Sequence, residues 1–387
     1  MLSPESGRHA ILALRIHIDL DDPTSRAFLE DCVGLLAARP ALELWAVCPR
    51  EQRRRLPRAL GDALATGQVR AFFYPRSKGA LRIWPCDDGK PLRDGGLLIS
   101  TKNDPPSIGH RNAHIFMAKH MNLALVGSPI AFEGGDVLCG ERHVFVGRHT
   151  LEKNPAAGRS AAQLARALGT LFAKPVFVLE TPKLKDPNLA KQFRHPMHVD
   201  TEVCLVFDRV TKRETVLVGD PKTLVEVILG LQPNRLRGRR AFAAAVREAF
   251  RGSSLGDYFV DPLIAVNWEG VLRARRHARA LRRHGYPVQF VPGFAGLSSP
   301  LDSLAAKKKQ EKKILRLLNY VNAVVDRGVV FLPWFEIPRL DSWTQEIVER
   351  LGYEVVPARS ARHSFTHLGG PHCLTSAIRF RPSGART

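Results

Sequence analysis

The sequence has 387 residues, of which 44% are hydrophobic and 25% are charged. This composition is typical of a folded globular protein with one large core or two ordinary ones. The chain contains no uncharged apolar run of about 18 residues, and Glu5, Arg8, Arg15 and Asp19 interrupt its beginning. The sequence therefore predicts neither a membrane span nor a secretion signal, and we expect a cytoplasmic protein.

The six cysteines, at positions 32, 48, 86, 139, 204 and 373, lie far apart along the chain. They form no CxxC pair and have no spacing typical of a zinc site. Dispersed cysteines of this kind indicate free thiols in a reducing compartment, not a disulfide framework.

Charge is the unusual feature of the composition. The chain has 58 lysines and arginines against 37 aspartates and glutamates, a formal net charge of +21, which favours polyanionic partners. Much of the excess is arginine in two amphipathic stretches, residues 235–252 and 272–285. Because no nucleic-acid-binding motif accompanies them, we interpret both as solvated helix faces. An acidic macromolecular partner stays open, and nucleic acid is the less favoured partner.

Two hydrophobic periods alternate along the chain. Helical spacing predicts helices at residues 24–38, 51–66, 160–172, 241–251, 304–318 and 341–351. Apolar and β-branched runs predict strands at residues 42–48, 69–74, 123–129, 175–180, 287–294 and 353–358. This alternation predicts an α/β fold.

Five segments have the pattern of a strand, a polar or glycine turn, and a second strand. They begin at residues 82, 133, 198, 263 and 319. A hairpin that recurs together with helix and strand material predicts radial repetition, in which each unit packs against its neighbours. A doubly wound sheet is the alternative. Because no linker divides the chain, we expect a single domain spanning residues 1–387.

Chemically useful side chains lie at the starts of these hairpins. Asp87, Glu133, His198 and Asp200 occupy such positions, and Cys373 opens the last predicted strand. In a radially repeated fold such positions converge on the axis. A cysteine that faces a histidine suits nucleophilic attack on an electrophilic carbon. Carboxylates beside a thiolate suit a cationic substrate, and a guanidinium is the planar cation that carboxylates bind in bidentate fashion.

Several segments resemble one known family. FEGGDVLCGERHVFVG (132–147), PMHVDTEVCLVFD (196–208) and LGGPHCLTSAIRF (368–380) occur in the order found in the penteins that modify guanidino groups, namely the arginine, agmatine and protein-arginine deiminases, dimethylarginine hydrolases and amidinotransferases. WPCDDGKP (84–91) resembles their tryptophan, two residues and aspartate, and residues 319–341 resemble the hairpin before their final helix. The resemblance covers residues 82–380.

The resemblance implies a five-bladed α/β propeller with pseudo-fivefold ββαβ repeats, and a role for each candidate residue. Cys373 would be the nucleophile, and His198 would protonate the departing nitrogen and then activate water. Asp87 and Asp200 would hold the guanidinium nitrogens, and Glu133 would orient His198. The implied activity is that of a deiminase that needs no cofactor and acts on arginine or a related small guanidine.

The sequence departs from the family pattern beside the first aspartate. Cys86 stands where these enzymes usually have arginine, so Asp88 and Asp104 are alternatives to Asp87. The proline in GGPHC is a second departure.

Two other functions stay open. The ending GGPHCLTSAIRF also resembles that of amidinotransferases, in which an amine replaces water. A non-catalytic basic binding pentein is the third alternative. We expect no metal, because His367 and His372 have no third ligand at a suitable spacing.

Overall fold

The computed structural model describes fourteen stretches of the chain. They are residues 1–75, 81, 83–87, 89–100, 107–121, 123–152, 154, 160–179, 193–194, 198–249, 251, 260–297, 313–364 and 369–380. No helix in these stretches has both the length and the hydrophobicity needed to cross a lipid bilayer. All six cysteines are free and buried.

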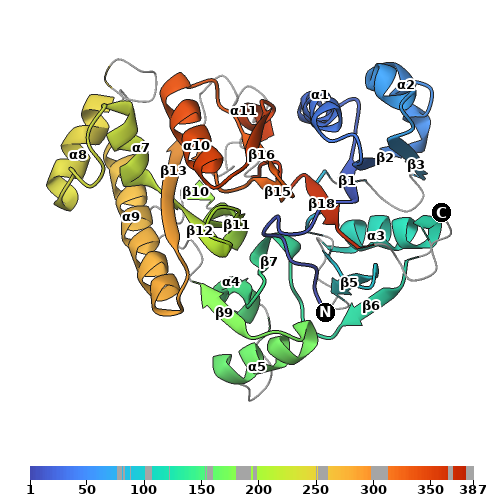
Figure 1. Cartoon of the computed structure of the whole chain (residues 1–387), viewed down its shortest axis with the longest axis horizontal. Helices are drawn as coiled ribbons and strands as arrows, with labels where there is room; N and C mark the ends of the chain where they lie inside the picture. Colours follow the sequence, from blue (N-terminus) through green and yellow to red (C-terminus); the bar gives the residue numbers. More distant parts are fainter. Residues whose placement is uncertain are drawn as a thin grey trace.

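The described residues form five β-sheets (Figure 1). One sheet has the order β18 (Thr375–Ile378), β1 (Ala13–His17), β2 (Glu43–Pro49) and β3 (Val69–Tyr74). Three sheets have three strands each: β4 (Lys90–Pro91), β5 (Leu97–Ser100) and β6 (Leu125–Ser128); β7 (Val137–Cys139), β8 (Val144–Gly147) and β9 (Val176–Leu179); and β15 (Val324–Asp326), β16 (Val329–Pro333) and β17 (Glu354–Ala358). The largest has the order β10 (Phe193–Arg194), β14 (Lys313–Asn319), β13 (Val288–Leu297), β12 (Arg213–Asp220) and β11 (Val203–Asp208).

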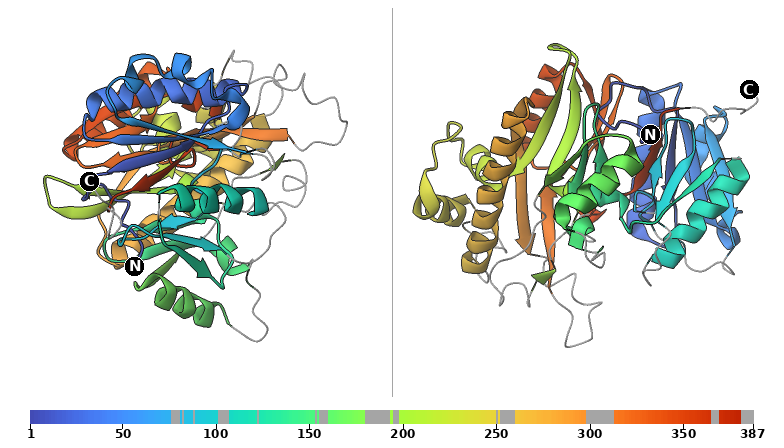
Figure 2. Two further views of the ribbon diagram at one scale, coloured as in Figure 1. Left: turned by 90° about the vertical axis from the view of Figure 1, so that its right-hand side faces the viewer. Right: turned by 90° about the horizontal axis from the view of Figure 1, so that it is seen from below.

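Every sheet contains the same unit, an antiparallel pair of strands extended by a parallel third strand. A parallel neighbour needs a crossover, and helices supply it in each case. These helices are α1 (Pro23–Ala38), α3 (Ser107–Met121), α4 (Arg148–Glu152) with α5 (Ala161–Phe172), α7 (Pro221–Ile228) with α8 (Gly238–Ala249) and α9 (Val260–Arg283), and α10 (Pro338–Arg350). Short helices α2 (Leu56–Leu60) and α11 (Ala361–Ser364) lie in other connections. Figure 2 shows the crossover helices on the outside of the strands.

The first sheet takes its antiparallel pair from the two ends of the chain. In four sheets the pair is a hairpin, but β1 pairs with β18, with Ala13 opposite Ile378. The last strand therefore completes the first unit, and it sets the segment before β18 beside the starts of the other hairpins.

Two crossover helices begin in the same way. Asp22 and Asp220 each precede a proline at the first helical position, and each carboxylate accepts hydrogen bonds from backbone N–H groups of the first turn. Proline has no N–H to satisfy there, and aspartate satisfies N–H groups that would otherwise have no partner. An Asp-Pro pair thus starts a helix next to a strand.

Most predicted elements are confirmed, including the α/β class and all six predicted strands. Helices α1, α5, α8 and α10 lie where the helical spacing predicts them, whereas residues 51–66 contain α2 between two short 3-10 helices.

The hairpin predicted at residue 263 is wrong, because this segment belongs to the 24-residue helix α9. The buried residues Ile264, Asn267, Val271, Ala274 and Ala278 recur at intervals of three and four, which is helical spacing. Helix α9 packs on β12 and β13. The fifth antiparallel pair is β18 with β1, which no local window of sequence could reveal.

The helix predicted at residues 304–318 is also wrong over its second half. Residues Lys313–Asn319 form β14, which pairs antiparallel with β13. The apolar residues there fit either period, and pairing with β13 decides for a strand. Residues 304–312 lie outside the described residues.

Candidate functional site

Each sheet contributes one segment to a common site. In four sheets this segment precedes the first strand of the hairpin, and in the remaining sheet it precedes β18. Cys373 precedes β18 and Asp87 precedes β4. Glu133 and His198 are the N-cap residues of short 3-10 helices that lead into β7 and β11. Asn322 precedes β15. The repeated unit therefore gathers residues that are far apart in the sequence.

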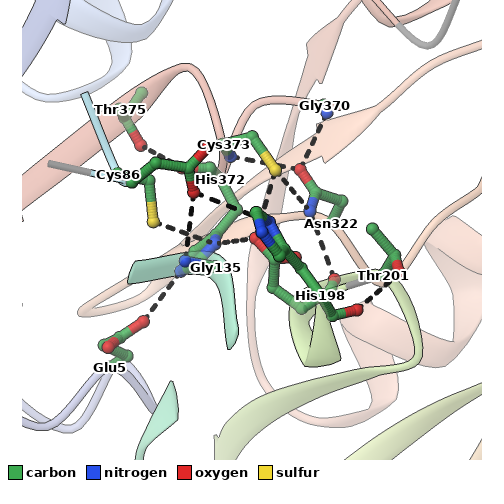
Figure 3. A network of polar contacts seen from close by, with 12 residues as sticks. Glu5, Cys86, Gly135, His198, Thr201, Asn322, Gly370, His372, Cys373 and Thr375 are labelled. Carbon is green, nitrogen blue, oxygen red and sulfur yellow. Dashed lines mark hydrogen bonds and ion pairs between the residues drawn. The ribbon is translucent and has the colours of Figure 1, made fainter. Parts of the chain in front are cut away.

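Cys373 is 4% exposed and has polar partners on two sides (Figure 3). Its Sγ lies 3.1 Å from Asp200 Oδ2 and 3.2 Å from Asn322 Nδ2, which donates to the sulfur. The Cys373 N–H donates to Asn322 Oδ1 at 3.2 Å, and Gly370 N–H donates to the same oxygen at 2.9 Å. One asparagine side chain thus holds the backbone before β18 and also contacts the sulfur.

His198 lies between two carboxylates. Its Nε2 is 2.5 Å from Glu133 Oε2, and its Nδ1 is 3.6 Å from Asp87 Oδ1. Burial by itself would lower the pKa of His198, but Asp87, Glu133 and Asp200 outweigh it and hold the pKa well above its usual range. His198 is therefore an imidazolium at neutral pH, with a proton to give.

Asp200 connects the cysteine to a second histidine. His372 Nδ1 donates to Asp200 Oδ2 at 2.8 Å, the same oxygen that lies beside Cys373 Sγ. Burial by itself would raise the pKa of Asp200, but His372 and His198 outweigh it and lower the pKa. Asp200 Oδ1 is buried and has no hydrogen-bond partner among the described residues. An ionised oxygen without a donor is a free acceptor for a ligand.

The pKa of Cys373 is raised well above its usual range, first by burial and then by the charges of Asp200 and Asp87. The thiol is therefore protonated at neutral pH in the ligand-free site. A cation that binds among these carboxylates opposes their effect and favours the thiolate.

Two glycines allow this close packing. A Cβ on Gly135 would lie 2.4 Å from His198 Nδ1 and 3.1 Å from Asp200 Oδ2, and a Cβ on Gly134 would lie 1.8 Å from the Cys86 carbonyl oxygen. Gly135 N–H also donates to Asp87 Oδ1 at 3.2 Å. The side chains of His198 and Asp200 thus pack directly against the Gly135 backbone, where any side chain would clash.

No protein-family model matches this sequence, and no curated protein matches it. Solved structures do match over nearly the whole chain. An agmatine deiminase from C. jejuni has a TM-score of 0.63 at 14% identity, covering 99% of this chain and 97% of its own. A cysteine-to-serine variant of that enzyme with substrate bound has a TM-score of 0.61 at 14% identity, with coverage of 99% and 97%. An agmatine deiminase of Enterococcus faecalis has a TM-score of 0.62 at 12% identity, with coverage of 98% and 96%.

The chain shares the fold of these deiminases. At these identities the likeness establishes the fold alone, and the chemistry depends on the site. The fold brings together all five residues that the sequence singles out, Cys373, His198, Glu133, Asp87 and Asp200. Asp88, Asp104 and His367 lie outside the described residues.

Sequence reasoning assigned no role in this site to three residues: Asn322, Glu5 and His372. A signal for Asn322 was present, because it lies in the fifth hairpin start, NYVN, at the position where the other hairpins supply Asp87, Glu133 and His198. No local signal marked Glu5, which precedes β1 by eight residues.

Ligand atoms of Cys86, Asp200 and His372 lie within 4.8 Å of one another and could hold a metal ion in the described part of the chain. However, His372 donates from Nδ1 to Asp200 and from Nε2 to Glu5, at 2.8 Å and 2.7 Å. Lys90 Nζ also lies 3.8 Å from Cys86 Sγ. A metal would have to displace the His372 proton and overcome the lysine charge.

Proposed function

We propose that the protein is a deiminase that hydrolyses the guanidinium group of arginine or a small arginine derivative to a ureido group, with release of ammonia. One observation carries this proposal. A buried thiol, that of Cys373, lies 3.1 Å from a buried carboxylate, that of Asp200, whose other oxygen has no partner among the described residues. A planar cation with several N–H donors, bound beside the sulfur, would donate a hydrogen bond to this oxygen and place an electrophilic carbon next to the thiol.

Asp200 and Asp87 bind the substrate in this proposal. Asp200 Oδ1 accepts a hydrogen bond from one guanidinium nitrogen. Asp87, whose Oδ1 lies 3.6 Å from His198 Nδ1, accepts a hydrogen bond from another. Charge-assisted hydrogen bonds of this kind fix a planar group and place its carbon against the nucleophile.

Substrate charge activates the nucleophile. Burial and the nearby carboxylates keep Cys373 protonated in the free site. The bound guanidinium opposes the effect of the carboxylates, so that the thiol releases its proton to solvent as substrate binds. The enzyme then has its reactive thiolate only when there is a substrate to attack.

Two steps follow. The thiolate attacks the guanidinium carbon, the carbon–nitrogen bond breaks, and the His198 imidazolium gives its proton to the departing nitrogen, which leaves as ammonia. The carbon now carries a thiouronium group. Neutral His198 takes one proton from water as the hydroxide oxygen bonds to the same carbon. The carbon–sulfur bond then breaks and the remaining hydroxyl proton passes to solvent, which gives the neutral ureido product and the thiolate.

We also interpret the five sheets as five blades of an α/β propeller, and residues 1–387 as one domain. The recurring unit of an antiparallel pair and a parallel third strand supports this interpretation, as does the pairing of β18 with β1.

The test is a turnover assay that measures ureido product and ammonia from arginine, agmatine, methylarginines and an arginine peptide, with and without an amine acceptor. We expect equal amounts of both products from at least one guanidine and no turnover by Cys373→Ala. Cys204→Ala is the matched control, because Cys204 is equally buried at 5% exposure and its sulfur donates to the Leu205 carbonyl oxygen.

A new guanidino product that forms only when the amine is present would show that the activity is amidino transfer and not hydrolysis. Turnover that survives Cys373→Ala would contradict the covalent route. Absence of turnover on every guanidine, with a Cys373 thiol no more reactive after guanidine is added, would contradict the proposed function.

A further inference from the structure

The first twelve residues run through the centre of the fold, where they contact all five sheets. In Figure 1 the dark blue N-terminal trace passes between the sheets before it enters β1. Hydrogen bonds join Ser3 N–H to the Pro91 carbonyl, Glu5 N–H to the Cys139 carbonyl, Phe207 N–H to the Ser6 carbonyl, Ile11 N–H to the Asp326 carboxylate and Leu12 N–H to the Ile378 carbonyl. Gly7 has φ +78°, and a Cβ there would lie 2.4 Å from Val325 Cγ1. The segment is therefore fixed by its neighbours.

This segment carries Glu5 into a buried ion pair. Glu5 Oε1 accepts from Lys90 Nζ at 3.0 Å and from Cys139 N–H at 3.3 Å. Glu5 Oε2 accepts from His372 Nε2 at 2.7 Å. Burial by itself would raise the pKa of Glu5, but Lys90 and His372 outweigh it and lower the pKa to about 2. Glu5 is thus a carboxylate over the working range of pH.

His372 joins Glu5 to the substrate-binding carboxylate (Figure 3). Its Nε2 donates to Glu5 and its Nδ1 donates to Asp200 Oδ2, so the ring is held as an imidazolium between two anions. Burial by itself would lower the pKa of His372, but Cys86, Asp200 and Glu5 outweigh it and keep the pKa well above its usual range. A neutral ring could donate to only one of the two carboxylates.

The geometry points to Glu5 as a positioning residue of the site: acting through His372, it fixes the Asp200 carboxylate with Oδ2 bound and leaves Oδ1 as the acceptor for the substrate. This inference rests on the proposed function, in which Asp200 binds the guanidinium. Besides His372, the groups that act on Asp200 or feel its charge are His198 beside β11, Lys90 on β4, Asp136 before β7 and Cys373 before β18. Of the three cationic residues His372, His198 and Lys90, only His372 donates a hydrogen bond to Asp200 in the described structure.

The experiment compares Glu5→Gln with Glu226→Gln. Glu226 is a matched control, because it forms a buried pair with Lys222 at 3.1 Å with both side chains 4% exposed, on α7. Nitrogen-15 NMR of the His372 ring, assigned with His372→Gln, follows its protonation. We expect Glu5→Gln to lower the pH at which His372 loses its proton and Glu226→Gln to leave it unchanged.

Turnover supplies the second readout. We expect Glu5→Gln to lower kcat/KM by about 10- to 100-fold through misplacement of Asp200, with a larger defect at pH 8 than at pH 6, since His372 is still protonated at the lower pH. A merely structural role would give a defect that does not change with pH. Glu5→Asp, which keeps the charge, should recover part of the loss.

The inference is overturned if Glu5→Gln leaves the His372 titration unchanged, or if its kcat/KM stays within twofold of wild type at both pH values. If Glu5→Gln does not fold, His372→Gln takes its place, and a kcat/KM within twofold of wild type at both pH values in that variant overturns the inference equally. The NMR comparison needs no turnover. Failure of the wild-type protein to hydrolyse any guanidine therefore contradicts the proposed function. An equal titration of His372 in wild type and Glu5→Gln contradicts this inference.

Discussion

The centre of the fold and the outer helices α8 and α9 carry opposite charges in different settings. In the centre, four carboxylates each contact a histidine: Glu133 and Asp87 contact His198 at 2.5 and 3.6 Å, and Glu5 and Asp200 contact His372 at 2.7 and 2.8 Å. On the outer helices, arginines are exposed to solvent, among them Arg239, Arg240, Arg275, Arg279 and Arg283.

This contrast separates the charge of the chain from the charge of its site. The exposed arginines of α8 and α9 contribute to the net charge of +21, and water solvates them. The centre instead collects carboxylates that are partly or fully buried, and the charge of each acts more strongly on its neighbours there because less water screens it. A cationic substrate can therefore suit a strongly basic protein.

The largest predicted effect comes from the centre. Asp200→Asn keeps the shape of the side chain but removes its charge, so that the guanidinium and the His372 imidazolium each lose one of their two anions. We expect kcat/KM to fall by about 10³-fold, as for loss of one partner of a buried charge pair. Steady-state kinetics measures this. Asp208→Asn, at the far end of β11, is the control and should stay within twofold. A variant at position 200 that keeps a tenth of wild-type kcat/KM would contradict the role of Asp200.

An intermediate effect is expected for Glu133→Gln, which leaves His198 with a weaker hold on its proton. The pKa of His198 is raised by neighbouring carboxylates, so removal of one carboxylate lowers it. Because the imidazolium is the acid that protonates the leaving nitrogen, the basic limb of the pH profile of kcat should move to lower pH. At pH 8, kcat should fall by about 10²-fold. If the basic limb of the kcat profile of Glu133→Gln stays at its wild-type pH, His198 is not the acid that protonates the leaving nitrogen.

The smallest effect is expected at the periphery. Arg275, Arg279 and Arg283 follow one another at intervals of four on the exposed face of α9. Replacing all three by glutamine should leave kcat within twofold and the free energy of unfolding within about 0.5 kcal/mol per site. The triple variant should elute earlier from a cation-exchange column. A large loss of kcat would mean that the outer arginines serve the site, and the contrast between the two regions would fail.

How well sequence predicted each element depended on where the determining contacts lie. Helix α5 begins with a capping box in which Ser160 and Gln163 satisfy each other's backbone N–H groups, and this signal is local. The segment at residue 263 has β-branched residues that suit a strand, yet its buried face has helical spacing and packs on β12 and β13. Strand β14 was mistaken for a helix, because β13 supplies its partner from another part of the chain.

The site divides in the same way. Sequence predicted Cys373, His198, Glu133, Asp87 and Asp200, because each lies in a short pattern at the start of a strand pair. Asn322 lies in the same kind of position, but an asparagine has no titration of its own to suggest chemistry. Glu5 became visible only when the fold set the N-terminal segment against His372 and Lys90.

The sequence by itself determined the α/β class, four of the helices, most strands of the recurring unit and the candidate side chains of the site, because these depend on local periodicity and residue chemistry. Tertiary structure decided which segments closed the first sheet, that α9 is one helix, and that four carboxylates lie beside two histidines. The physical reason is that pKa values and hydrogen-bond partners depend on burial and on charges a few ångströms away. Those neighbours come from all parts of the chain.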